Sequence, residues 1–355
     1  MWTRRVNVKQ LAILTAAALL VAASAASQDS SDRPPWARKT KSKSTPASTS
    51  TSTTPENTSP PEPVNKDNRD SNPNDEPNQR GRIRVSVNLV NVLVSVLDDN
   101  NRPAPDLPVE AFQIFEEGVQ QKIEVFESET KQPLDIALMI DASLSAHKEI
   151  TFEQQAAAHF IAQVLRPEDR LSVFAFDENV RQIAGFSENV KVLQNAVQKI
   201  PDGAGTSIYD AVVLGSNALE HRKEERRRVI IMVTDGGETT SRSDFEAARK
   251  AAVRANTLLY SIIVRPVKSE SGRNTAGEHA IETITDTTGG AIFFPDSAQD
   301  LDIIFDRIDR ELRTQYRLGY YPNPRGPANT YRSIQVKVLD NYKVRHRKTY
   351  LTGPQ

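Results

Sequence analysis

Cysteine is absent from this 355-residue sequence. Its absence excludes disulfide bonds, thiolate metal sites, a cysteine nucleophile and a lipidated N-terminal cysteine. The sequence also lacks an excess of charge of either sign, because the formal net charge is −1 at pH 7. We therefore do not expect binding to nucleic acid or to an anionic membrane surface. Long hydrophobic runs are missing beyond the N-terminus, so no later segment is expected to cross a bilayer.

A short apolar run lies close to the N-terminus, at residues 11–22. It follows a basic stretch at residues 4–9 and precedes the small residues 23–25, an order that is typical of a cleavable signal peptide. The run is shorter than the roughly 20 residues that a spanning helix needs. We predict that residues 1–25 are a signal peptide and that the protein is exported, to a periplasm or to the exterior (secreted), with no integral membrane span after cleavage. An uncleaved anchor is the alternative that the sequence leaves open.

Aliphatic residues are nearly missing from residues 26–81, which consist mainly of Ser, Thr, Pro, Asn and charged residues. A segment of this composition cannot bury enough apolar surface to offset the entropy lost on ordering. We predict that residues 26–81 are a disordered linker that acts as a tether.

Alternating apolar residues begin at Ile83 and continue to Val96 with one change of phase, which predicts either a bulged strand or two strands. Two further apolar runs, residues 112–115 and residues 123–126, flank Glu116-Glu117-Gly118 and predict a β-hairpin. The first part of the folded chain is therefore expected to be β-structure.

Alternation returns in the last part of the chain, between residues 316 and 346. Neither β block, residues 82–130 or residues 315–353, is large enough to hold a good hydrophobic core alone. We predict that the two blocks combine into one small β-sandwich, with residues 131–314 inserted between them as a separate domain.

Apolar runs alternate with amphipathic stretches throughout residues 131–314. The predicted strands are 134–140, 171–176, 228–233, 258–264 and 291–294, and the predicted helices are 148–165, 190–200, 207–221, 243–255, 278–287 and 298–314. This alternation is typical of an α/β domain in which a doubly wound, mostly parallel sheet is covered by helices on both faces.

Oxygen-bearing side chains follow three of these elements in loops. Asp141, Ser143 and Ser145 come directly after the strand 134–140, Thr206 lies in a glycine-rich loop before a helix, and Asp235 follows the most apolar strand. Ligands bind outside the carboxyl ends of the strands in open α/β sheets, and hard oxygen donors suit Mg²⁺ or Mn²⁺. Each residue alone could be a helix cap, but five of them on three loops predict a metal site.

The order and spacing of these five residues resemble the metal-ion-dependent adhesion site of von Willebrand factor type A domains. The plan of the whole chain also resembles a family of exported bacterial proteins related to these domains, described from acidobacteria. The resemblance implies that Ser143 and Ser145 bind the ion through their hydroxyls, while Asp141, Asp235 and Thr206 bind it directly or through water. It also implies an open coordination position, which an acidic residue of a partner protein fills, and hence adhesion without catalysis.

Motifs of other functional classes are missing. The sequence contains no Walker A loop, no Gly-x-Ser-x-Gly elbow with suitable partners, and no second aspartate of the type that dehalogenase-like phosphatases need. We therefore predict a protein-binding module that is not an enzyme. Two alternatives stay open: a cell-envelope assembly or chaperone-like factor that uses the same site, and a metal-dependent hydrolase with His147 or Glu238 as its base.

Overall fold

The structure, a computed structural model, describes residues 89–128, 131–143, 150–222, 225–264, 275–339 and 341–353. All of these belong to one compact unit, Gln79–Gln355. The predicted signal peptide and linker, residues 1–81, lie outside the described residues, as do residues 82–88, Ser145 and His147. Among the helices that the structure describes, none combines the length and the apolar character that crossing a bilayer requires.

A mostly parallel central sheet forms the middle of the α/β domain, with the strand order β10-β9-β8-β5-β6-β7. Its strands are β5 (Leu134–Asp141), β6 (Arg170–Phe176), β7 (Val180–Ser187), β8 (Arg227–Thr234), β9 (Thr257–Ile263) and β10 (Ala291–Phe293). Neighbouring strands run parallel except at one edge, where β7 is antiparallel to β6. Every residue of β5 is buried, as expected for a central strand that is covered on both faces. The predicted α/β fold is confirmed.

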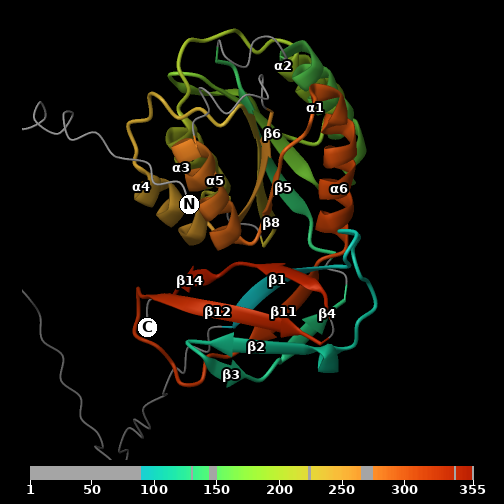
Figure 1. Cartoon of the computed structure of the whole chain (residues 1–355), viewed down its shortest axis with the longest axis vertical. Helices are drawn as coiled ribbons and strands as arrows, with labels where there is room; N and C mark the ends of the chain where they lie inside the picture. The colour runs from blue at the N-terminus through green and yellow to red at the C-terminus, as the bar shows by residue number, and fades with distance from the viewer. Residues whose placement is uncertain are drawn as a thin grey trace, which may run out of the picture. The chain divides into compact units, whose positions relative to one another are not determined.

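Helices cover both faces of the central sheet (Figure 1). One face carries α1 (Ile150–Val164), α2 (Val190–Val197) and α6 (Leu301–Arg313), and the other face carries α3 (Ile208–Glu220), α4 (Phe245–Arg254) and α5 (Thr275–Thr288). A 3-10 turn, η4 (Ala298–Asp300), precedes α6, so the predicted helix 298–314 begins with a tighter turn. Phe160 of α1 stacks on Phe305 of α6 with ring centroids 4.5 Å apart, which fixes these two helices against each other.

Strand β7 is an element that the sequence pattern does not predict. Its residues are only partly buried or exposed, and the polar residues Arg181 and Gln182 interrupt the apolar pattern. The pairing of β7 with β6 also contains register shifts, which obscure the alternation further. An edge strand of this kind is stabilised by its neighbour, so its own sequence carries a weak signal.

Two smaller sheets pack face to face to form a β-sandwich, one with the order β13-β1-β11-β4 and the other with the order β14-β12-β2-β3. Their strands are β1 (Val90–Leu97), β2 (Phe112–Glu116), β3 (Val119–Gln121), β4 (Val125–Glu127), β11 (Tyr316–Tyr320), β12 (Tyr331–Val338), β13 (Lys343–His346) and β14 (Thr349–Leu351), with a 3-10 turn η3 (Val109–Ala111) before β2. Strands from before and after the α/β domain alternate in these sheets, because β1 pairs with β11 and β2 pairs with β12. Ring centroids of Phe112 and Tyr316, one from each sheet, lie 4.8 Å apart in the shared core.

The predicted hairpin between residues 112–115 and residues 123–126 is wrong in its second strand. Glu117 and Gly118 have φ values of 49° and 79°, which form a tight two-residue turn and pair Glu116 with Val119. The returning strand is therefore β3. Strand β4 instead pairs with β11, which belongs to the opposite sheet. The chain therefore crosses from one sheet of the sandwich to the other between β3 and β4.

A buried histidine, His346, connects the two sheets of the sandwich. Its Nε2 accepts a hydrogen bond of 3.0 Å from the backbone N–H of Val336, and its Nδ1 lies 2.8 Å from the backbone carbonyl of Arg347. The neutral ring with the proton on Nδ1 satisfies both contacts. Burial lowers the pKa of His346 from 6.5 to about 4, with the charge of Lys348 acting in the same direction and the Arg347 carbonyl opposing it.

We expect His346 to make the folded protein less stable as the pH falls below 6.5. The unfolded chain takes up a proton on this ring near pH 6.5, whereas the folded protein does so only near pH 4. Between these values the unfolded state binds more protons, which removes about 2 kcal/mol of unfolding free energy near pH 5. Urea unfolding at pH 7.5 and pH 5 should show this loss in the wild type and a smaller loss in His346→Gln. The variant His279→Gln, at an exposed position on α5, serves as the control, and an unchanged pH dependence in His346→Gln would refute the assignment.

Candidate metal centre

Asp141 is the last residue of β5 and is completely buried. Its Oδ2 accepts a 2.6 Å hydrogen bond from the Thr234 hydroxyl, and its Oδ1 accepts a 3.0 Å hydrogen bond from the Ser143 backbone N–H. Thr234 ends β8, the parallel neighbour of β5, so the two strands end at the same edge of the sheet. Ser143 is also buried, with 1% of its surface exposed. The Asp141 carboxylate is therefore held by backbone and hydroxyl groups at a strand end, where α/β sheets place their ligands.

The surroundings of Asp141 are unfavourable for an isolated negative charge. The pKa of Asp141 is raised to about 6, mainly by burial and also by the nearby carboxylate of Asp235, although the hydrogen bonds from Thr234 and Ser143 act in the opposite direction. Two carboxylates at a dehydrated strand end repel each other, and a bound cation would relieve both the repulsion and the lost hydration.

The glycine-rich loop before α3 docks onto the end of β5. The backbone N–H of Gly203 donates a 2.7 Å hydrogen bond to the carbonyl of Ala142. A Cβ atom at Gly203 would lie 2.1 Å from Oδ2 of Asp177, and Asp177 is itself held by an ion pair with Arg181. A glycine is therefore needed for the loop to approach the strand end so closely.

Thr206, at the end of this loop, is held by the loop that follows β8. The Thr206 backbone N–H donates to the Thr239 hydroxyl at 2.8 Å, and the Thr206 carbonyl accepts from the N–H groups of Thr239 and Thr240 at 2.9 and 3.1 Å. Only 3% of the Thr206 surface is exposed. A Cβ atom at Gly205 would lie 2.5 Å from Cγ2 of Thr240, so the second glycine of the loop permits this clamp. Thr239 and Thr240 are not among the predicted site residues. They follow the Asp-Gly-Gly turn after one intervening residue, Glu238, and this position is the signal that could have revealed them.

Asp235 directly follows β8 and is partly buried. Its Oδ1 accepts a 2.8 Å hydrogen bond from the backbone N–H of Gly237, and the positive φ of Gly236, 83°, lets the chain turn back over the strand end. The structure therefore brings Asp141, Ser143, Thr206 and Asp235 to the side of the central sheet where β5 and β8 have their carboxyl ends.

The donors at this edge fit a small divalent cation. Carboxylate and hydroxyl oxygens are the ligands of Mg²⁺ and Mn²⁺. Within the described ranges, no group of three or more His, Cys, Asp or Glu side chains is placed to hold a metal, so hydroxyl oxygens would have to complete the set. Ser145, the fifth predicted ligand, lies outside the described residues, and the assignment of all five as ligands stays a prediction.

Glu238 has a structural role next to this site. Its Oε2 accepts hydrogen bonds from the backbone N–H groups of Ile208 and Tyr209 at 2.8 and 3.2 Å, and from the Ser241 hydroxyl at 2.8 Å, while its Oε1 accepts from the Ser241 N–H at 2.9 Å. A carboxylate in this position satisfies the free N–H groups and the dipole at the start of α3. Glu238 thus orients the helix that follows Thr206, and its oxygens are already engaged.

Comparison with known proteins finds similarity within the α/β domain. Residues 136–238 match the family model of the von Willebrand factor type A domain, a range that runs from β5 to the loop after β8. The chain is 28% identical over 106 residues to an uncharacterized protein of Synechocystis sp., sll0103, which covers 29% of this chain and 25% of that protein. The chain therefore spans about a quarter of the length of this relative.

Solved structures with similar folds come from several organisms. A von Willebrand factor type A protein from Catenulispora acidiphila has a TM-score of 0.47 and 12% identity, covering 73% of this chain and 76% of that chain. Proximal thread matrix protein 1 from the mussel byssus, with a zinc-occupied MIDAS motif, has a TM-score of 0.44 and 16% identity over 56% of this chain and 49% of its own. BatB from Bacteroides thetaiotaomicron has a TM-score of 0.40 and 16% identity over 50% of this chain and 98% of its own.

Proposed function

Because residues 136–238 match the family model of the von Willebrand factor type A domain, we propose that the α/β domain binds a partner protein through a divalent cation held at the strand ends described above. The observation that carries the proposal is that three hydrogen-bonded loops meet at the end of β5, where the carboxylate of Asp141 is buried. These loops place Asp235, Ser143 and Thr206 at the same strand ends, and they leave oxygen atoms as the donors.

In the proposed complex, Asp141 and Asp235 supply the negative charge, and Ser143, Ser145 and Thr206 supply neutral hydroxyl oxygens. When bound, Mg²⁺ or Mn²⁺ would provide a Lewis-acid position for a carboxylate of the partner. Two carboxylates with neutral hydroxyls leave the charge of a divalent cation exposed to a third carboxylate, so the partner is expected to present an aspartate or a glutamate.

A binding role is favoured over a hydrolytic one because of Glu238. A hydrolase needs a general base near the metal. The hydrogen bonds that Glu238 accepts at the start of α3 engage both of its carboxylate oxygens as a helix cap. The second candidate base, His147, lies outside the described residues. We therefore propose that the protein is not an enzyme.

We further propose that the protein acts outside the cytoplasm, as a member of the exported bacterial proteins that its overall plan resembles. The composition of residues 1–25 supports export, and the composition of residues 26–81 supports a tether that gives the binding domain reach.

We expect metal-dependent binding of acidic peptides to be lost when the hydroxyl of Thr206 is removed. Full-length protein would be screened against a peptide display library in Mg²⁺ and in EDTA, and each binder would be compared with its Asp→Asn or Glu→Gln counterpart. Binding should vanish in EDTA and in the amide counterparts, and Thr206→Val should weaken it at least about tenfold, because one charge-assisted contact is lost. Thr283→Val, which removes a hydroxyl on α5 that donates to a helix carbonyl, is the matched control. Binders that are equally tight in EDTA, or a library without any carboxylate-dependent binder, would contradict the proposal.

A further inference from the structure

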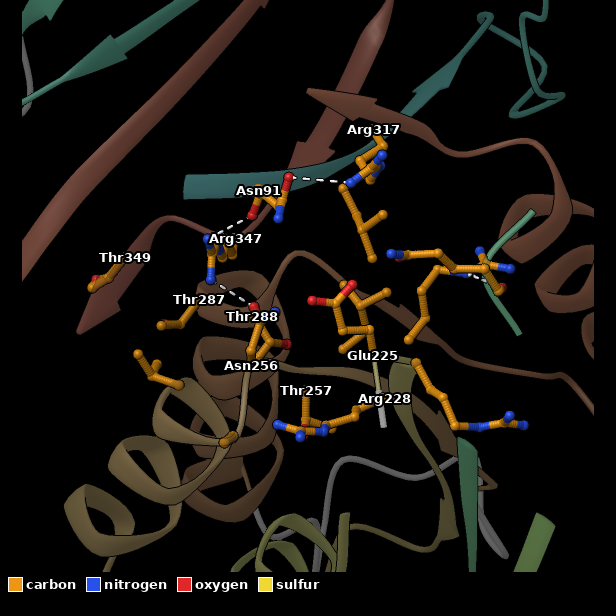
Figure 2. A pocket seen from close by; sticks show the side chains of 17 residues that line it. Asn91, Glu225, Arg228, Asn256, Thr257, Thr287, Thr288, Arg317, Arg347 and Thr349 are labelled. Carbon is orange, nitrogen blue, oxygen red and sulfur yellow. Dashed lines mark hydrogen bonds between the residues drawn. The ribbon is translucent and has the colours of Figure 1, made fainter. Parts of the chain in front are cut away.

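A cavity of about 290 Å³ lies between the β-sandwich and the α/β domain. Its walls come from β1 and β11 of the sandwich, from the segment after β13, and from the residues around the amino ends of β8 and β9 (Figure 2). The candidate metal centre lies at the carboxyl ends of the same parallel strands. The cavity and the metal centre are therefore at opposite ends of these strands. The cavity is therefore a separate site.

Positive charge dominates the lining of this cavity. Five arginines and one glutamate contribute to its walls: Arg226, Arg227, Arg228, Arg317, Arg347 and Glu225. Two of the arginines are neutralised, because Arg226 forms an ion pair with Asp135 and Arg317 forms one with Glu127. Arg228 and Arg347 form no ion pair with any carboxylate in the described part of the chain.

Arg347 reaches from the sandwich to the α/β domain (Figure 2). Its Nη1 donates a 2.6 Å hydrogen bond to Oδ1 of Asn256, and its Nη2 donates a 2.6 Å hydrogen bond to the backbone carbonyl of Asn91. Both acceptors are neutral, and the buried Nε has no hydrogen-bond partner among the described residues. Burial lowers the pKa of Arg347 to about 10, which leaves it a cation at neutral pH. Arg347 is only partly buried, and its guanidinium carbon lies 5.5 Å from the centre of the Tyr350 ring, but no carboxylate balances its charge. An anion in the cavity would supply this counter-charge.

We propose that this cavity binds a small molecule through an oxyanion, a carboxylate or a phosphate group, which lies beside the guanidinium of Arg347. Guanidinium groups are donors that recognise such anions. The volume is sufficient for a small organic acid or a phosphate ester, at the lower end of ligand pockets. Because the walls belong to both parts of the unit, the anion would strengthen the joint between the sandwich and the α/β domain. This binding needs no metal and does not depend on the proposed function.

The experiment is calorimetric titration of the full-length protein with inorganic phosphate, citrate and acetate, at constant ionic strength set with sodium chloride. We expect saturable binding of at least one of these anions, with a matching rise in the unfolding temperature. Preference for phosphate would identify a phosphate group as the recognised chemistry, and preference for citrate or acetate would identify a carboxylate. Equal effects of all three anions and of additional chloride would overturn the proposal.

Two variants make the test specific. Arg347→Gln removes the cation that has no carboxylate partner and should weaken anion binding at least about tenfold. Glu225→Gln removes the one acidic side chain in the lining, which is exposed, and should tighten binding about threefold. An unchanged affinity in Arg347→Gln, or in Glu225→Gln should the first variant not fold, would refute the proposed site.

Discussion

Replacement of Asp141 by asparagine is expected to abolish the stabilisation of this protein by Mg²⁺. Asp141 carries the buried carboxylate at the end of β5, and an asparagine side chain in its place would keep the shape and the hydrogen bond from Ser143. The charge that attracts the cation would be gone, and affinity should fall at least about 100-fold, since even indirect partners of metal ligands contribute about 10-fold to 100-fold. The metal-free variant should be no less stable than the metal-free wild type, because it loses a buried charge next to Asp235.

Thermal unfolding measures this effect directly. At a Mg²⁺ concentration of about 100 times the dissociation constant, binding adds about 2.7 kcal/mol to the stability of the wild type. For a folded unit of this size, that corresponds to a rise of about 5–10 °C in the unfolding temperature. Asp141→Asn should show no rise, and calorimetry should detect no heat of Mg²⁺ binding.

A second aspartate provides the control for this prediction. Asp302 is an exposed residue of α6 that contacts His159, and Asp302→Asn removes the same charge from an exposed position. It should keep the full response to Mg²⁺. A wild-type protein that does not respond to Mg²⁺ or Mn²⁺, or an Asp141→Asn variant that responds normally, would remove the proposed metal centre.

Substitution of Gly290 by alanine is expected to be the most destabilising single change outside the metal centre. Gly290 lies between the end of α5 and β10, and a Cβ atom there would be 1.8 Å from the backbone carbonyl oxygen of Leu259 and 2.6 Å from its carbonyl carbon. Leu259 belongs to β9, which is paired with strands on both sides, so its backbone cannot move away. The expected loss is about 3–5 kcal/mol, a large part of the stability of a typical domain.

Urea unfolding and the yield of soluble protein would both report this loss. Gly185 in β7 provides the matched control, because a Cβ atom at that position would meet nothing within 4 Å. Gly185→Ala should change the unfolding free energy by no more than about 0.5 kcal/mol. A Gly290→Ala protein that is as stable as Gly185→Ala would mean that the segment between α5 and β10 does not approach β9 as closely as the structure shows.

Much of the α/β domain can be predicted from local sequence patterns. The apolar runs of β5 and β8 are long and uninterrupted, and the helices between strands have clear amphipathic periodicity. Edge strand β7 escapes prediction because its burial depends on one neighbour and its residues are mixed in polarity. The partner of β4 escapes prediction because the tight turn at Glu117 and Gly118 ends the hairpin early, and no local pattern shows which sheet the next strand joins.

The candidate metal centre can likewise be predicted in part from the sequence. Asp141 and Asp235 could be recognised because each follows an apolar strand, and parallel strands bring their ends to one edge. The clamp of Thr206 by Thr239 and Thr240 could not be recognised, because it depends on backbone hydrogen bonds between loops 33 residues apart.

The sequence by itself determined the class of the fold, the order of its elements and the oxygen-bearing residues at the strand ends, because these properties follow from local periodicity and from strand direction. Tertiary structure alone decided which strands share a sheet, which glycines must lack a side chain, and where unpaired polar groups meet. Arg347 and Asn256 are 91 positions apart, yet they meet across the cavity between the sandwich and the α/β domain. Such a contact depends on how two separately patterned parts pack together, and that packing leaves no periodic signal in the sequence.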